Sequence, residues 1–369
     1  MPVSGPARPA RIRGCGFRLA VLAGALTVAS GALAACGTSG SGTPGSSATT
    51  TATAASYPVT VTNCGVPVSY DHAPKRAVSN DINTTEDMLA LGLESRMVGD
   101  FGVTGDGPVS KPVPDRYLAG FRAVPAVSPD YFTLEKLVGV HPDFLFAGWN
   151  YGLQADTTLT PDNLAHYGIK TLVLNESCVH VQPGKSGASI DDTYQDLRNL
   201  GVIFGVQQRA SKVIAAMRAQ VASVRVTVGS LKPVTVFDYD SGQAAPFTGP
   251  GLAMPNALIS MAGGINIFGS LKRSWTSVSW EQVVKADPQC IIINDYGTPT
   301  AQQKEKFLET NEVTRKITAV RNQCFLALSY DEVTPGPRNA EAVVALARWL
   351  HPGAYGLSAV ERAYPRSAG

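Results

Sequence analysis

The sequence has little charge of either sign and few histidines or cysteines. Lys and Arg number 31 against 29 Asp and Glu, so the net charge is +2, and only 16% of the 369 residues are charged. A near-neutral chain without long charge runs gives no support to a nucleic-acid partner. The five histidines are scattered without ligand spacing and no Cys-x-x-Cys occurs, so we expect no zinc or other bare metal site.

Recognisable catalytic motifs are missing as well. There is no Gly-x-Ser-x-Gly elbow and no His-Glu-x-x-His pair, and GKSG at 184–187 lacks the upstream glycine of a phosphate loop. We therefore expect the chain not to be an enzyme and to carry no cofactor. What it has is 44% hydrophobic residues, enough over this length to build two cores.

The N-terminus is typical of an exported lipoprotein. In 1–35 a region with several arginines precedes an apolar stretch of small residues, and the stretch ends in Leu33-Ala34-Ala35-Cys36. This tetrapeptide resembles a bacterial lipobox, which predicts lipidation of Cys36. The Gly-, Ser- and Thr-rich segment 36–57 then predicts a flexible tether. The alternative is secretion after cleavage at an Ala-x-Ala site, with Cys36 unmodified.

One module occurs twice. TLEKLVGVHPDFLF at 133–146 and SWEQVVKADPQCII at 279–292 both run from a hydroxyl residue through Glu and apolar residues to Pro and an apolar run. The pattern predicts a short capped helix, stopped by Pro, that leads into a buried strand. Two copies, with Glu135 matching Glu281, predict two similarly built α/β lobes with a ligand cleft between them.

Strands alternate with helices along the rest of the chain, which predicts a parallel sheet flanked by helices in each Rossmann-like lobe. We expect an N-terminal lobe at 58–205, a long connector helix at 206–230 and a C-terminal lobe at 231–369. The first helix is expected to be capped by Thr84 or Thr85, after a loop that begins at Asp81.

Four cysteines fall in the folded part of the chain, and an even number in an exported protein permits two disulfides. Cys290 and Cys324 both precede apolar runs that could form neighbouring strands. We therefore prefer the pairs Cys64–Cys178 and Cys290–Cys324, one in each lobe. The alternative is four buried thiols.

Aromatic residues follow several of the predicted strands. In open α/β sheets ligands bind beyond the carboxyl ends of the strands, and aromatic walls suit a bulky, partly apolar ligand. The alternative is that these rings fill the lobes or their interface. Arg338 is a candidate partner for an anionic group on the ligand. The candidate ligand-binding residues are Asp81, Asn83, Trp149, Tyr151, Tyr239, Phe247, Trp275, Tyr296, Tyr330 and Arg338.

In order, these motifs resemble the iron-siderophore and vitamin B12 class of ABC-transporter substrate-binding proteins, the two-lobed type with a helical backbone. The matching stretches run from PKRAVSN and TEDMLALGLESRMVG, through both modules, to PGPRNAEAVVALARWL. The resemblance implies that Glu135 and Glu281 engage arginines of the permease, although the helix dipole alone also accounts for both glutamates. It also implies that Trp149, Phe247 and Trp275 occupy cleft positions that contact ligand in the B12-binding members.

The sequence thus predicts a monomeric lipoprotein, anchored to the extracytoplasmic face of the cell membrane. We expect it to capture an Fe(III)-siderophore and deliver it to an ABC permease and its ATPase. Vitamin B12 or heme is the nearest alternative ligand. A sensor or adhesion lipoprotein without a transport role is the alternative from another class.

Overall fold

The computed structural model describes residues 56–103 and 113–357. The signal segment 1–35, the lipidation candidate Cys36 and nearly all of the tether lie outside the described residues. The described residues group into one compact unit. Within the described part of the chain, no helix has the length and apolar character needed to cross a membrane.

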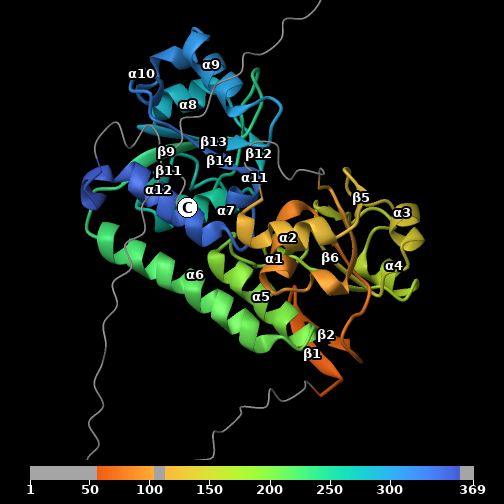
Figure 1. The fold of residues 1–369 in the computed structure, drawn as a ribbon. Helices are drawn as coiled ribbons and strands as arrows, with labels where there is room; N and C mark the ends of the chain where they lie inside the picture. The colour runs from red at the N-terminus through yellow and green to blue at the C-terminus, as the bar shows by residue number, and fades with distance from the viewer. Residues whose placement is uncertain (1–55, 104–112, 358–369) are drawn as a thin grey trace, which may run out of the picture. The chain divides into compact units, whose positions relative to one another are not determined.

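The N-terminal lobe is built on a parallel sheet in the order β5-β4-β3-β6-β7, with β8 also paired to β6 (Figure 1). A hairpin of two antiparallel strands precedes this sheet. The hairpin strands are β1 (Val59–Asn63) and β2 (Val66–Tyr70), and the sheet strands are β3 (Ala77–Asn80), β4 (Met97–Phe101), β5 (Ala126–Ser128), β6 (Phe144–Trp149), β7 (Gly152–Leu153) and β8 (Lys170–Val173). The helices are α1 (Ile82–Ala90), η1 (Glu94–Arg96), α2 (Asp115–Ala123), α3 (Leu134–Gly139), α4 (Pro161–Ala165), η2 (Asn175–His180) and α5 (Ile190–Ile203).

The C-terminal lobe repeats the design with a parallel sheet in the order β11-β9-β13-β14. Its strands are β9 (Val234–Tyr239), β11 (Gly264–Asn266), β13 (Cys290–Asp295) and β14 (Phe325–Ser329), with a small antiparallel pair β10 (Phe247–Thr248) and β12 (Thr276–Ser277) beside them. Its helices are α7 (Met254–Met261), α8 (Trp280–Ala286), α9 (Ala301–Thr310), η3 (Thr314–Lys316), α10 (Thr318–Arg321), α11 (Tyr330–Val333), α12 (Asn339–Leu350) and η4 (Pro352–Tyr355). The α/β class and the two parallel sheets are as the sequence predicts.

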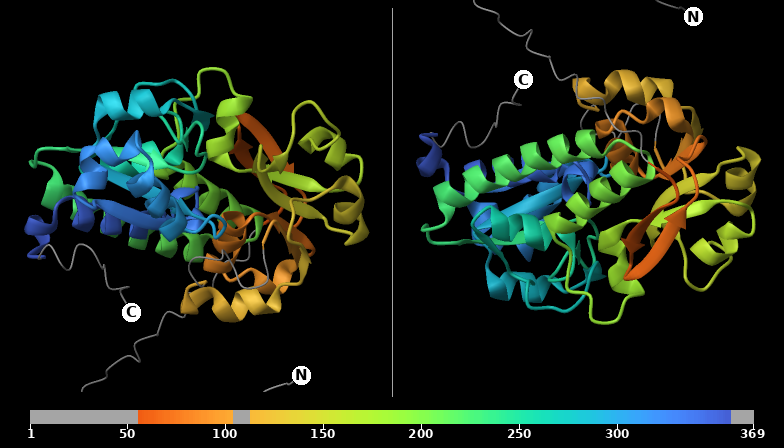
Figure 2. Two further views of the ribbon diagram at one scale, coloured as in Figure 1. Left: turned by 90° about the horizontal axis from the view of Figure 1, so that it is seen from above. Right: turned by 90° about the horizontal axis from the view of Figure 1, so that it is seen from below.

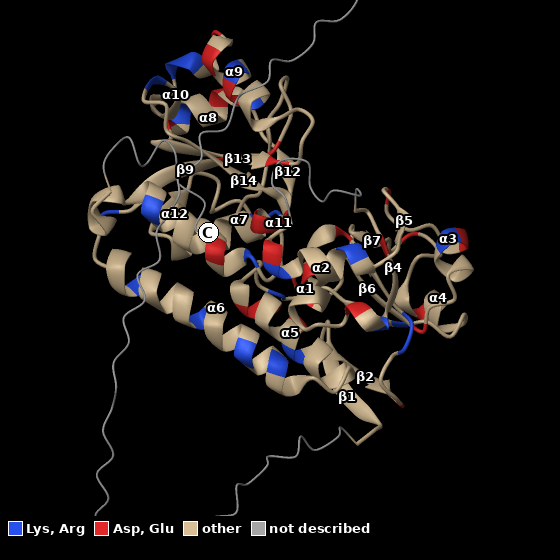
Figure 3. Cartoon of the chain, viewed as in Figure 1, with Lys and Arg blue, Asp and Glu red and all other residues tan. Residues whose placement is uncertain are grey.

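The long helix α6 (Gln207–Val228) belongs to both lobes (Figures 1 and 2). Its first half buries Ile214 and Met217 in the N-terminal core, and its second half buries Val224 and Val228 in the C-terminal core. The helix carries Lys and Arg but no acidic residue (Figure 3). Because each end is packed into a different core, α6 acts as a stiff strut rather than a flexible hinge.

The duplicated module is visible in the backbone. His141 and Asp287, which occupy the matching position before Pro, both adopt the left-handed conformation, with φ of 48° and 42°. Two residues further on, the side chain of Asp143 accepts the backbone N–H of Arg76, directly before β3. The side chain of Gln289 likewise accepts the backbone N–H of Thr235 in β9. Both modules therefore end their helix and position their strand by the same local geometry.

The start of α1 differs from the sequence expectation. The N-cap is Asp81, whose carboxylate accepts the N–H of Ile82 at 2.8 Å, rather than Thr84 or Thr85. The two threonine hydroxyls lie inside the first turn and donate back to the backbone carbonyl of Asp81. Several adjacent residues can cap this helix, and the earliest of them, Asp81, does so.

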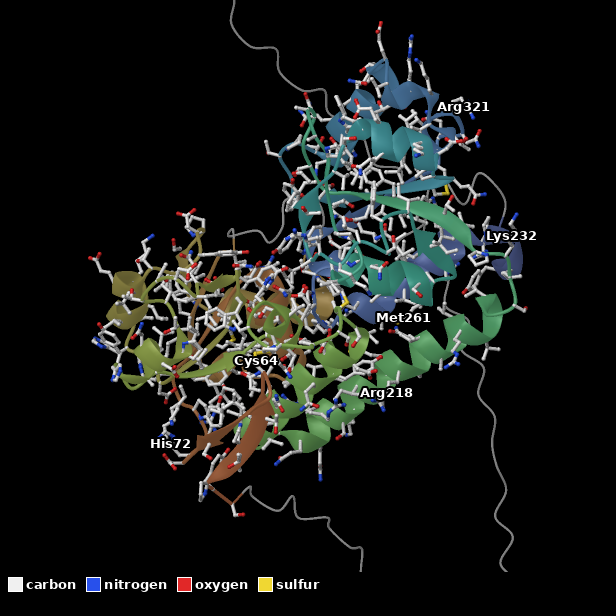
Figure 4. All side chains as sticks on the ribbon, turned by 180° about the vertical axis from the view of Figure 1, so that it is seen from behind. Cys64, His72, Arg218, Lys232, Met261 and Arg321 are labelled. Atoms are coloured by element: carbon white, nitrogen blue, oxygen red, sulfur yellow. A yellow bond between two sulfur atoms is a disulfide. The ribbon has the colours of Figure 1, made fainter. Side chains whose placement is uncertain are left out.

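Two disulfides join the cysteines as predicted. Cys64 in the hairpin turn is bonded to Cys178 in η2, and Cys290 at the start of β13 is bonded to Cys324 just before β14. Figure 4 labels Cys64, one of the two cysteines of the first bond. Each lobe thus carries one covalent tie, and the first of them attaches the N-terminal hairpin to its lobe.

Candidate functional site

A cavity of about 650 Å³ lies between the two lobes. It is reached by the ends of strands from both sheets, as expected for an open α/β fold. Most of its wall is apolar, and six aromatic side chains line it. They are Tyr131, Tyr151, Phe247, Trp275, Tyr296 and Tyr330, joined by Asp81, Ile82, Gly102, Val103, Asn150, His180, Asp240, Ser274 and Thr334.

Both lobes contribute a carboxylate at the same place in their fold. Asp81 directly follows β3 and Asp240 directly follows β9, and each of these strands lies inside its sheet with a neighbour on either side. The carboxyl ends of these strands point toward the cavity, so their next residues line it. The equivalence of the two positions is a second sign of the duplicated design.

Asp81 holds the two lobes together at the cavity wall. The hydroxyls of Tyr131 from the N-terminal lobe and Tyr330 from the C-terminal lobe both donate to its Oδ2, at 2.6 and 2.7 Å. The residue has φ of 93° and ψ of 153°, a backbone conformation that residues other than glycine rarely adopt. Burial raises the pKa of the Asp81 carboxyl to about 6, against the lowering effect of the tyrosine hydrogen bonds.

Asp240 is arranged differently. The ammonium group of Lys304, a residue only 2% exposed, donates to the backbone carbonyls of Asp240 and Asn294 at 2.6 Å each. The same ammonium lies over the ring of Tyr296, 3.9 Å from its centre. Burial raises the pKa of the Asp240 carboxyl, and the positive charge of Lys304 counteracts that rise.

The opposite wall is a stacked aromatic pair. Phe247 on β10 and Trp275 just before β12 lie with ring centres 6.0 Å apart and planes 16° from parallel. The two-residue pairing of β10 with β12 sets this spacing, because it aligns the segments that carry the rings. A flat apolar face of this size suits a ligand with a bulky, partly planar body.

Residues 78–329 match the model of the periplasmic binding protein family. The chain belongs to this family. Its members are solute-binding proteins, not enzymes, and they act outside the cytoplasm as components of ABC transport systems.

Relatives of this periplasmic binding protein include vitamin B12-binding proteins. That of Photorhabdus laumondii is 23% identical over 237 residues, which are 64% of this chain and 75% of the relative. That of Yersinia pestis is 25% identical over 222 residues, 60% and 70% of the two chains.

Solved structures share the fold. A periplasmic binding protein from Veillonella parvula has a TM-score of 0.68 and 28% identity, covering 80% of this chain and 97% of its own. A protein of an ABC-type Fe³⁺-hydroxamate transport system from Saccharomonospora viridis has a TM-score of 0.65 and 22% identity, covering 82% and 100%. The two-lobed architecture is therefore that of the family.

Six of the ten residues proposed from the sequence for ligand binding line the cavity of this binding protein. The residues at the cavity are Asp81, Tyr151, Phe247, Trp275, Tyr296 and Tyr330. Each follows a strand or lies in a loop beside one, which is the rule that selected it. Their role in binding stays a prediction, to which the structure adds that they line one cavity.

Arg338 lies outside the lining and does not provide the expected positive charge there. It is buried, and its guanidinium pairs with Asp331, with Glu332 at 3.3 Å and with Glu86 at 3.9 Å. These three acids come from the helices packed around it, so the arginine neutralises an internal acidic cluster. The positive charge of Arg338 is thus already paired inside the fold.

The other three proposed residues are also absent from the cavity lining. The amide of Asn83 donates to the carbonyl of Pro335 at 2.6 Å, across the lobe junction. Trp149 packs against the core of the N-terminal lobe. Tyr239 packs against Trp280 in the C-terminal core. Its neighbour Asp240, directly after the end of β9, lines the cavity instead.

The most informative residue missed from the sequence is Tyr131. It lies three residues after the short strand β5. The sequence of this strand, AVS, carries almost no strand signal, so Tyr131 could not be found by looking for aromatic residues that follow predicted strands. His180 is one of the five histidines that are scattered in the sequence without ligand spacing. It lines the cavity from the end of η2, and burial lowers its pKa, which favours the neutral imidazole.

Proposed function

We propose that this periplasmic binding protein captures a ferric siderophore outside the cytoplasm and delivers it to an ABC permease and its ATPase. The observation that carries the proposal is the aromatic cavity between the lobes. Its volume of about 650 Å³ lies within the range of small-molecule sites, and its wall combines six aromatic rings with few polar groups. A chelate with an apolar rim and polar coordinating groups matches such a wall.

Vitamin B12 is the second candidate ligand. The relatives from Photorhabdus and Yersinia are named for binding it, and the stacked pair Phe247 and Trp275 offers a planar face for a corrin ring. The family resemblance also assigned ligand contact to these two positions. The two candidates use the same cavity, so one titration separates them.

The test is a titration of intrinsic tryptophan fluorescence with a ferric hydroxamate, a ferric catecholate, ferric citrate, heme and cyanocobalamin. Saturable quenching by one ferric chelate supports the proposal, and quenching by cyanocobalamin alone moves the ligand to vitamin B12. Phe247→Ala, which keeps every tryptophan, should weaken binding at least tenfold, in line with about 1.4 kcal/mol for the loss of a stacked ring. Trp149→Phe is the matched control, because it removes a tryptophan outside the cavity lining.

Delivery to the permease is proposed to use Glu135 and Glu281. Both are exposed in the first turn of equivalent helices, α3 on one lobe and α8 on the other (Figure 1). A carboxylate at each end of a two-lobed body forms a two-point contact for basic residues on a transporter. The pKa of the Glu281 carboxyl is lowered by a hydrogen bond from Ser279, so this group stays ionised.

Membrane attachment is proposed to occur through a lipid on Cys36. The sequence Leu33-Ala34-Ala35-Cys36 and the polar tether after it support the proposal. Replacing the thiol in Cys36→Ser should move the protein from the membrane fraction to the soluble fraction of cells. Unchanged membrane association of this variant would reject lipid anchoring.

A further inference from the structure

Among the described residues that line the cavity, the charged side chains are of one sign. Two carboxylates, Asp81 and Asp240, are among its lining residues, whereas no Lys or Arg is among those that the structure describes. His180 adds no charge when its imidazole is neutral, the form that burial favours. A ligand that enters this cavity therefore meets negative groups and aromatic faces.

The two carboxylates differ in how well they are compensated. The positive charge of Lys304 partly compensates Asp240, and Asp238 and Asp295 interact with the same ammonium group. The charged group that acts most strongly on Asp81 is another acid, Asp331. Arg338, the cation paired with Asp331, is also held by Glu332 and Glu86. The negative charge at Asp81 is thus left for a ligand to balance.

The groups around Asp81 suit a cation in a second way. Tyr131 and Tyr330 donate their hydroxyls to the carboxylate, which brings the two rings beside it. Tyr151, Phe247 and Trp275 supply further ring faces on the same cavity. An aromatic enclosure with a carboxylate in its wall is the arrangement that proteins use to bind ammonium groups.

The backbone conformation of Asp81 also indicates that its carboxylate is needed at the cavity. A glycine would adopt φ of 93° and ψ of 153° without strain, yet the chain has an aspartate there. Capping of α1 alone does not require this geometry, since Thr133 and Ser279 cap α3 and α8 from ordinary extended backbone. The strained position is explained when the carboxylate itself is needed at the cavity wall.

We infer that the cavity selects ferric chelates that carry a positively charged group, such as a free ammonium, and that Asp81 determines this selectivity. The inference rests on the proposed function and narrows its ligand class. Three hydroxamates neutralise Fe³⁺, so a trihydroxamate chelate with a free amine is cationic. Catecholates are dianions, so three of them leave a strongly negative complex, which Asp81 would repel.

The experiment compares two chelates that share one coordination core. Ferrioxamine B has a free ammonium group, and its N-acetylated form is the neutral counterpart; a ferric tricatecholate is the anionic probe. Binding of each to the purified protein is measured by isothermal titration calorimetry at neutral pH. The wild type should bind ferrioxamine B about tenfold more tightly than the acetylated form, and the tricatecholate most weakly.

The matched variants are Asp81→Asn and Asp100→Asn. The first removes the charge at the cavity wall and should reduce the preference for the ammonium form to less than about twofold. The second removes another buried carboxyl, on β4 and outside the lining, and should keep the full preference. Raising the salt concentration should narrow the preference of the wild type.

The outcomes distinguish a failure of the charge selectivity from a failure of the proposed function. Equal or tighter binding of the acetylated or catecholate complex by the wild type overturns the charge selectivity and leaves iron-chelate capture standing. An undiminished preference in a folded Asp81→Asn variant overturns the role of Asp81. Silence toward every ferric chelate rejects the proposed function and, with it, this inference.

Discussion

The two lobes share one design but treat charge differently. Each places an aspartate after a strand inside its sheet, at the cavity, and each contains the same helix–Pro–strand module. In the C-terminal lobe a buried lysine compensates the acids. In the N-terminal lobe Asp81 is supported by two tyrosine hydroxyls, one from each lobe, and the charge that acts on it from the described residues is that of another acid, Asp331. The common scaffold fixes where the carboxylates lie, and their neighbours decide whether they stabilise the lobe or meet the ligand.

The largest expected effect concerns the surface on which the lobes are most alike. Glu135→Arg and Glu281→Arg should each lower uptake of the ligand at least tenfold, and the double variant should abolish it, because each reversal replaces attraction to the permease by repulsion. Uptake by cells and binding by the purified protein are measured together. Binding should be unchanged, and Glu312→Arg, an exposed reversal elsewhere, is the control. Full uptake with either single variant would mean that the lobes dock unequally.

The disulfides give the next largest effect. Cys64–Cys178 closes a separation of 114 residues and Cys290–Cys324 one of 34, so the first restricts the unfolded chain more. Replacing each pair by Ala should lower the free energy of unfolding by about 5 and about 4 kcal/mol respectively. Chemical denaturation measures both values. A larger loss for the C-terminal pair would show that contacts within the lobes outweigh chain entropy.

Lys304 tests the compensation in the C-terminal lobe. Lys304→Met should cost about 3 kcal/mol of unfolding free energy, since Asp238, Asp240 and Asp295 lose their shared counter-charge. Lys306→Met, on the exposed side of the same helix, should change stability by less than about 0.5 kcal/mol. Equal stability of the two variants would contradict the assignment of Lys304 as a structural cation.

The backbone at the two aspartates provides a smaller and sharper contrast. Asp81→Gly should be more stable than Asp81→Ala by about 1 to 2 kcal/mol, because both lose the carboxylate but only glycine relieves the strained φ. At Asp240, which is absent from the described residues with positive φ, the order should reverse and alanine should be the more stable. Thermal unfolding of the four variants measures both differences.

The smallest expected effect is a decline of Tm with pH. Burial raises the pKa of the Glu176 carboxyl to about 8 and that of Asp238 to about 7. The folded state therefore favours the protonated acids, and their contribution to stability is lost as pH rises through these values. Tm should fall by a few degrees from about pH 6 to about pH 9. Glu176→Gln and Asp238→Asn should each make the decline of Tm with pH less steep, because each removes one of these carboxyls. A wild-type Tm that rises over this pH range would contradict the assignment.

Local pattern was sufficient for the elements that depend on neighbouring residues. The module at 133–146 and 279–292 folds as predicted because hydroxyl caps, helix-period apolar residues and Pro act within a few positions. The connector α6 was visible from its length and spacing alone. The cysteine pairing followed because β13 and β14, where Cys290 and Cys324 lie, are adjacent parallel strands.

The candidate site was only partly visible, for reasons of direction and distance. Tyr239 and Asp240 are adjacent, and tertiary packing at the end of β9 places Tyr239 in the core and Asp240 at the cavity. Arg338 was expected to face a ligand, but the acids that hold it come from α1 and α11, far apart in the chain. Periodicity reports the face of an element, and it does not report what another element brings to that face.

By itself, the sequence determined the α/β class, the two lobes, the strut between them and the aromatic character of the strand ends. Short-range propensity and apolar periodicity are enough for these features. Tertiary structure alone decided that Asp81 meets Tyr330, which lies 249 positions away. Such contacts depend on how two separately folded sheets pack, so the charge and contents of the cavity emerge only when the lobes come together.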